Sequence, residues 1–169
     1  MLYDVGTVRG VTCLNNIMYV VYGESSTIRL YSTDTYSPLD VVINIQGMID
    51  PSDMAVCSDD RQLYIGDKDY CIWRVSADDH SYVQWLPTES TTDIQLLWSL
   101  SVTSRRLVVT TTSPTPCLRQ YSTTDRQLLH HIPLPHYVTG LGHAVETTRQ
   151  TFVIGHRGTL KDMWQFAVS

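Results

Sequence analysis

The four cysteines are the residues of this sequence whose chemistry depends most directly on spacing. Cys13 and Cys57 lie 44 residues apart, and Cys71 and Cys117 lie 46 residues apart. No Cys-x-x-Cys pair is present, so the usual spacing of zinc ligands is missing. Such similar spacings indicate equivalent positions of repeated sheets, which stack about 10 Å apart, whereas a disulfide needs Cα atoms within about 7 Å. We therefore expect the cysteines to be small, buried hydrophobic side chains without disulfides.

The histidines gather in the stretch HHIPLPH, which contains His130, His131 and His136. Adjacent residues of a strand point to opposite faces, so His130 and His131 cannot both bind one metal ion simply. The sequence also lacks Gly-x-Ser-x-Gly, a glycine-rich phosphate loop and His-Glu-x-x-His. It therefore predicts surface histidines, no metal site, no catalytic residues and no cofactor.

Composition limits the classes of partner. The 169 residues are sufficient for one domain with a core. Charged residues make up only 17%, and the net charge of −5 argues against a surface that binds nucleic-acid phosphates. No apolar run reaches the roughly 18 residues that span a bilayer, and the first ten residues lack the pattern of a signal peptide. These features predict a cytoplasmic protein that does not enter a membrane.

An internal repeat of about 45 residues determines the expected fold. The aligned positions of one strand are Tyr19, Tyr64, Val108 and Val153, with offsets of 45, 44 and 45. An apolar residue of an earlier strand lies eight positions upstream of each: Val11, Val56, Leu100 and Val145. The following strand begins at Ile28, Ile72, Leu118 and Met163, with offsets of 44, 46 and 45. Three columns that share one period indicate a repeated supersecondary unit.

A fourth strand fits at the end of the first three units, at 39–45, 82–86 and 127–132. Four short strands in about 45 residues are typical of a β-propeller blade. We therefore predict an all-β chain in which residues 1–169 form a single β-propeller segment with blades at about 8–46, 53–87, 98–133 and 143–169. Three blades would be complete and the fourth would have three strands, as in part of a six-bladed propeller. The alternative is a closed four-bladed propeller with a short last blade.

The second unit carries a family resemblance. The phrase LYIGD at 63–67, followed by Ile72 and Val75, resembles the NHL repeat, in which an LYVAD-like strand is followed by a short turn and an IxVF-like strand. YVTN-type, TolB-like and WD40 propellers use similar columns, and no Trp-Asp dipeptide ends a third strand in this sequence. The resemblance implies a protein- or RNA-binding scaffold of the kind often joined to ubiquitin-ligase modules. The third unit departs from the phrase, because Thr110 and Thr111 stand where Asp or Gly is expected.

Loops that follow the second strand of each blade share one face with the loops that link the blades, and loops held on a rigid scaffold commonly carry the ligand. Residues that the sequence places in the loops between second and third strands are Tyr22, Glu24, Asp67, Lys68, Tyr70, His156 and Arg157. We predict that they bind a protein or peptide and that the chain is a non-catalytic interaction module. One alternative is a fragment of a lactonase-like propeller hydrolase with a metal ion in its channel. Another is an RNA-binding or substrate-recognition propeller of the NHL type.

Overall fold

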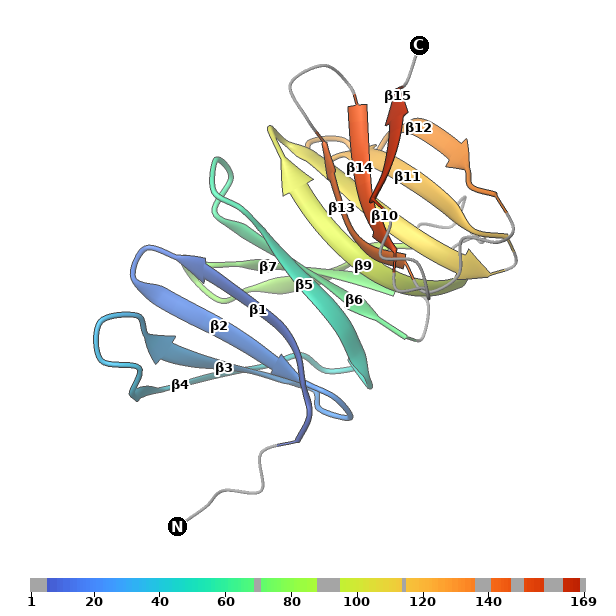
Figure 1. Ribbon diagram of the computed structural model, residues 1–169. Coiled ribbons are helices and arrows are strands. Elements are labelled where there is room, and N and C mark those ends of the chain that lie inside the picture. Colours follow the sequence, from blue (N-terminus) through green and yellow to red (C-terminus); the bar gives the residue numbers. More distant parts are fainter. Residues whose placement is uncertain are drawn as a thin grey trace.

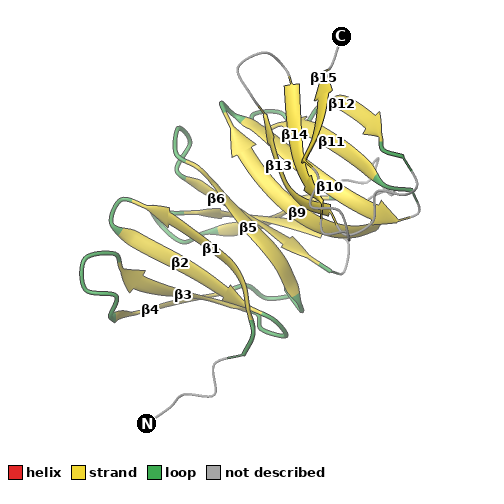
Figure 2. Cartoon of the chain, in the orientation of Figure 1, coloured by secondary structure: helices red, strands yellow, loops and turns green. Residues whose placement is uncertain are grey.

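The computed structural model describes residues 6–68, 71–87, 95–113, 115–135, 141–146, 151–156 and 163–167. Within these ranges every regular element is a strand, and the strands form four antiparallel sheets that follow one another along the chain (Figures 1 and 2). No helix in the described part of the chain is long and apolar enough to cross a membrane.

Each sheet is a meander, in which strands that are neighbours in the sequence are also neighbours in space. The first sheet consists of β1 (Val8–Leu14), β2 (Ile17–Tyr22), β3 (Thr27–Ser32) and β4 (Pro38–Asn44). The second consists of β5 (Pro51–Cys57), β6 (Gln62–Asp67), β7 (Cys71–Ser76) and β8 (Tyr82–Leu86). The third consists of β9 (Gln95–Thr103), β10 (Arg106–Ser113), β11 (Cys117–Ser122) and β12 (Leu128–Pro133). The last consists of β13 (Leu141–Glu146), β14 (Thr151–His156) and β15 (Met163–Ala167).

The sheets pack face to face in sequence order. Strand β1 packs against β5, β5 against β9, and β9 against β13. Meandering sheets that contact one another through their first strands are arranged like successive propeller blades. This is the arrangement that the 45-residue repeat predicts.

The core lies between the sheets. Between the first and second sheets it contains Tyr19, Ile28, Leu30, Ile65 and Trp73, with further aliphatic side chains around them. Between the second and third sheets it is built around Trp85, whose ring meets two tyrosine rings edge to face. The centroid of the Trp85 ring lies 5.2 Å from the ring centroid of Tyr64 and 6.1 Å from that of Tyr121. Aromatic pairs prefer this geometry because the ring edge is positive and the face negative.

The cysteines are free thiols. Cys57, Cys71 and Cys117 are buried, as the sequence predicts. The same prediction is wrong for Cys13, which is exposed. The register explains the difference: Cys13 pairs with Met18, whereas Cys57 pairs with Gln62, and the residue of the first sheet in the place of Cys57 is the buried Leu14, which pairs with Ile17.

A serine at the end of the third strand organises the turn to the fourth strand in three sheets. In the second sheet, Ser76 Oγ accepts hydrogen bonds from the amides of Asp78 and Asp79, at 3.3 and 3.4 Å. His80 then adopts φ 60°, a left-handed conformation that closes the turn. The equivalent serines, Ser32 and Ser122, accept the same two bonds. Each turn is also joined to the turn between the first two strands of its sheet, because the amides of Thr33, Ala77 and Thr123 donate to the carbonyls of Asn16, Arg61 and Arg105.

We expect one pH effect from this turn. Hydrogen bonds from Ser76 and then Ser81 hold the pKa of Asp79 at about 2, below its usual 3.8. Because the folded pKa is depressed, the ionised carboxylate stabilises the fold above the unfolded pKa. That contribution should disappear as pH falls from about 4 towards about 2. Urea unfolding of the native chain and of Asp79→Asn across this range checks it: the difference in stability should shrink as pH falls, and a constant difference would contradict the assignment.

Candidate functional site

One cluster joins three loops at the same edge of the first two sheets. It lies where the turn after β2, the linker at 45–50 and the end of β6 meet. The carboxylate of Asp50 accepts a hydrogen bond from the amide of Glu24 at 3.1 Å and pairs with the ammonium group of Lys68. The amide of Lys68 donates to the backbone carbonyl of Asp50 at 3.1 Å. We call the surface formed by Glu24, Ile49, Asp50 and Lys68 the loop face.

Close packing shapes the loop face on the side of the first sheet. A Cβ atom at Gly23 would lie 2.8 Å from the Nε of Arg9 and 3.5 Å from a carboxylate oxygen of Asp50. The absence of a side chain at Gly23 therefore leaves room for the end of the flexible Arg9 side chain beside Asp50. Burial raises the pKa of Asp50. The hydrogen bonds from Lys68 and the Glu24 amide, together with the charges of Lys68 and Arg9, outweigh that effect, so the net pKa lies below its usual 3.8. Asp50 is thus an ionised centre of this cluster at neutral pH.

Asp67 supports the loop face from inside. Its side chain is fully buried, and its two carboxylate oxygens accept hydrogen bonds from the amides of Ile49 and Asp50 at 2.8 and 2.9 Å. The indole N–H of Trp73 also donates to it, at 3.4 Å. The expectation that Asp67 contacts a partner is therefore corrected. A carboxylate at the end of a strand is drawn inward here because a linker from the preceding sheet presents two unpaired amides to it.

Tyr22 is likewise not a side chain of the loop face. It is only 7% exposed, its hydroxyl shares a hydrogen bond with that of Tyr31 at 2.9 Å, and the guanidinium of Arg29 lies 5.6 Å from its ring centroid. Burial and then the contact with Tyr31 raise the pKa of Tyr22 to about 12, against the opposing charge of Arg29. Tyr22 therefore packs on a face of the first sheet rather than presenting itself to a partner.

Two predicted binding residues do lie on the loop face: Glu24 is exposed and Lys68 is partly exposed. Tyr70 and Arg157 lie outside the described residues, and of His156 only the backbone, at the end of β14, is described. Sequence reasoning missed Ile49, which is 58% exposed. Its signal was an apolar residue in a short linker, between Gly47 with φ 98° and the proline that begins β5.

At the opposite edge, ties between sheets repeat with the period of the chain. The guanidinium of Arg105, in the turn before β10, lies 3.2 Å from the carboxylate of Asp60, in the turn before β6. One sheet earlier, Arg61 donates to the side-chain oxygen of Asn15 when that amide is oriented with its oxygen towards the arginine. Thr123 also donates to Asp60, at 3.2 Å. Arginines in these turns thus reach back to the preceding sheet.

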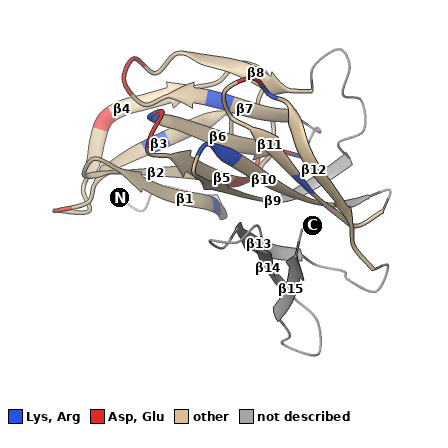
Figure 3. Ribbon diagram, turned by 90° about the horizontal axis from the view of Figure 1, so that it is seen from above, with Lys and Arg blue, Asp and Glu red and all other residues tan. Residues whose placement is uncertain are grey.

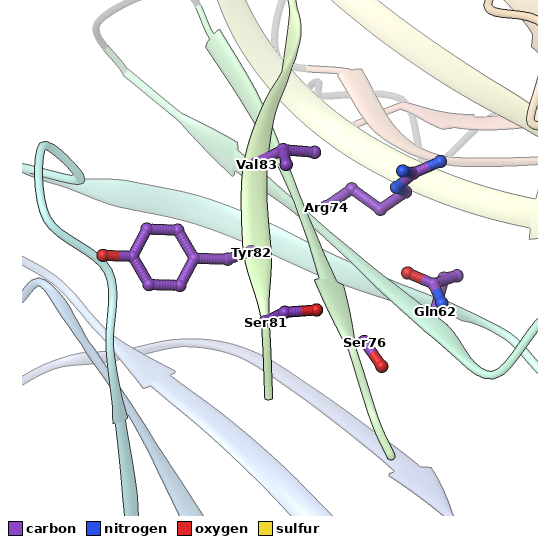
Figure 4. A pocket seen from close by; sticks show the side chains of 6 residues that line it. All are labelled: Gln62, Arg74, Ser76, Ser81, Tyr82 and Val83. Carbon is purple, nitrogen blue, oxygen red and sulfur yellow. The ribbon is translucent and has the colours of Figure 1, made fainter. Parts of the chain in front are cut away.

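A cleft of two adjoining cavities opens beside these ties, and both include the side chains of Gln62 and Arg74. The cavity of about 220 Å³ is lined by the second sheet, and the cavity of about 280 Å³ lies between the second and third sheets. Figure 4 shows Tyr82 pointing away from Arg74 and Gln62. The Tyr82 hydroxyl accepts a hydrogen bond from the amide of Gln46 at 3.1 Å, so this ring belongs to the contact with the first sheet.

Tyr64 forms part of the cleft wall. Burial raises the pKa of Tyr64 to about 12, while the charge of Arg74 and a hydrogen bond with Thr123 oppose the rise. The phenol of Tyr64 is therefore neutral at physiological pH and contributes an uncharged side chain to the cleft wall.

Among the described residues, no group of three His, Cys, Asp or Glu side chains is placed to bind one metal ion. His130 is partly buried and His131 exposed on β12. Acidic and basic residues are interspersed along the described strands and turns (Figure 3).

Comparison with known proteins identifies the fold. No family profile and no curated sequence matches the chain. Among solved structures, the crystal structure of the RRP9 WD40 repeats matches with a TM-score of 0.71 and 11% identity over 99% of this chain and 52% of that one. The WD40 β-propeller domain of Doa1 matches with a TM-score of 0.70 and 20% identity, over 98% and 53%. U3-55K matches with a TM-score of 0.68 and 10% identity, over 99% and 53%.

The chain spans about half the length of these structures. Their similarity confirms the predicted all-β fold, a partial β-propeller of successive antiparallel blades. Two of these structures are described as WD40 repeats or a WD40 propeller, so the NHL-like subtype stays a prediction.

Proposed function

We propose that this chain is a non-catalytic propeller module that binds a protein or peptide through the loop face. The observation that carries the proposal is the display of Ile49. This apolar side chain is 58% exposed, and its own amide and the next one are both held by the buried carboxylate of Asp67. The propeller fold supports the proposal, because propeller loops are scaffolded surfaces suited to recognition.

Rigidity of the display is what favours binding. Association costs free energy for every side chain and loop that it immobilises, and a loop that is already ordered avoids most of that cost. Ile49 is also flanked by Glu24 and by the Lys68–Asp50 pair. An apolar centre with a charged rim is the usual anatomy of a protein interface. The net charge of −5 disfavours a nucleic-acid partner, because a surface that binds phosphates needs a basic patch.

A peptide selection tests the loop face. Peptides selected from a displayed random library on the native chain should bind Ile49→Asp at least about tenfold more weakly, equivalent to ~1.4 kcal/mol, when the synthetic peptides are titrated by fluorescence anisotropy. The charge replaces the apolar contact without touching Asp67. Leu128→Asp is the matched control, because Leu128 is an exposed apolar residue on the distant strand β12. Equal affinity for both variants would sink the proposal.

A further inference from the structure

The cleft lies beside two positions of the second sheet that differ from their equivalents in the first sheet. Between the first and second sheets, Ile17 and Leu30 pack into the core, and Leu30 is only 2% exposed. The equivalent positions in the second sheet are the first residue of β6, which is Gln62, and the residue two before the turn serine, which is Arg74. Two positions that are apolar in the first sheet are thus polar in the second, and both cavities include these side chains. They are polar again in the third sheet, at Arg106 and Gln120.

The walls of this space offer hydrogen-bonding groups from both sheets. One cavity is lined by the hydroxyls of Ser76 and Ser81 beside Arg74, and the other by Thr123 and Thr124. Arg74 and Gln62 point to the same side in Figure 4. Arg74 pairs laterally with Tyr64 on β6 and with Val83 on β8, so its backbone is fixed in the middle of the sheet.

Charge in the cleft is unbalanced at one residue. Arg105 is paired with Asp60 at 3.2 Å, and Arg61 is paired with Asp78 at 2.5 Å. The guanidinium of Arg74 has neither an ion-pair nor a hydrogen-bond partner among the described side chains. The Arg74 guanidinium can therefore still form charge-assisted hydrogen bonds with an acceptor supplied by a ligand.

We propose that this cleft binds an acidic side chain of a protein partner, with a carboxylate seated on Arg74. The planar guanidinium can donate two parallel N–H bonds to the two oxygens of one carboxylate. A single uncompensated cation balances one negative charge, whereas a phosphate dianion beside Asp60 would remain undercompensated. The hydroxyl of Thr124 provides a further donor at the rim. This site is separate from the loop face, since it lies at the edge formed by the other set of turns.

The test uses two displayed peptide libraries with the same random flanks, one with a fixed central Glu and the other with a fixed central Gln. Both are selected on the Ile49→Asp chain, which removes binding to the loop face, so that failure of one site is distinguishable from failure of the other. The Glu library should be enriched at least about tenfold over the Gln library. Absence of that preference, or of any enrichment, would overturn the proposal.

Variants of the arginine complete the test. Arg74→Leu restores the residue found at the equivalent position of the first sheet, so it should fold with an undiminished melting temperature and bind the selected Glu peptides at least about tenfold more weakly. Arg74→Lys keeps the charge without the fork and should bind with intermediate affinity. Binding that survives Arg74→Leu would refute the role of the arginine. Tighter binding of a phosphoserine version of the same peptide would refute the assignment to a carboxylate.

Discussion

Replacing Trp85 by alanine should lower the free energy of unfolding by about 3–5 kcal/mol, the usual loss for a large buried aromatic side chain. The Trp85 side chain is fully buried and lies between the rings of Tyr64 and Tyr121. Its removal would leave a cavity in the core that joins the second and third sheets. Urea denaturation followed by circular dichroism measures the loss, and a change under about 1 kcal/mol would contradict this packing.

Trp85→Phe is the matched control. The indole N–H of Trp85 is buried and has no hydrogen-bond partner among the described groups, so phenylalanine would sacrifice no hydrogen bond there. It would keep an aromatic edge against both tyrosines while losing part of the buried area. We expect roughly a third of the loss caused by alanine, because most of the transfer and packing energy remains.

Replacing Asp67 by alanine should cost about 2–4 kcal/mol, because two backbone amides and one indole N–H would lose their acceptor, and each unsatisfied buried donor costs about 1–3 kcal/mol when water cannot replace the bond fully. Hydrogen exchange gives a second readout, since the amides of Ile49 and Asp50 should exchange faster while those of β6 are less affected. Glu24→Ala is the control. Its exposed side chain should change stability by no more than about 0.5 kcal/mol.

The Asp67→Ala variant also tests whether Asp67 affects peptide binding by holding the linker at 45–50 in place. If Asp67 acts only by holding the linker, peptides selected on the native chain should bind Asp67→Ala more weakly even though its carboxylate is buried. A variant that loses stability but keeps both the slow exchange of Ile49 and full peptide affinity would show that the linker does not depend on Asp67.

Much of the fold could be predicted from the sequence because propeller strands follow local rules. Tyr19 and Tyr64, which occupy one column of the repeat, are both buried in the interfaces between sheets. Each strand ends at turn residues that are close to it in the sequence. Register within a meander needs only neighbouring strands. Periodicity and turn chemistry therefore carry most of the information about the sheets.

The site was less predictable because its geometry depends on contacts between sheets. A strand-end carboxylate such as Asp67 looks the same in sequence whether it faces water or caps a linker 17 residues upstream. The position of Tyr22 gave no sign that Tyr31 would satisfy its hydroxyl. The column of Arg74 gave no warning either, because its aligned residues are Leu30, Gln120 and Gln165 and a polar residue there is ordinary for this repeat. Cys13 shows another limit: the turn between β1 and β2 is shorter than that between β5 and β6, so aligning the two cysteines by their spacing placed Cys13 on the wrong face of its strand.

The nearest-neighbour order of the sheets, β1 on β5, β5 on β9 and β9 on β13, has a consequence for how the chain folds as it is made. Each meander closes on itself within a short stretch of sequence, so little loop-closure entropy opposes its formation. The first sheet has all its strands before the second begins, and the next contact waits only for one further unit. Stability then divides into a term for each sheet and a term for each interface. A ribosome delivering this sequence thus releases units in the order in which they can stack.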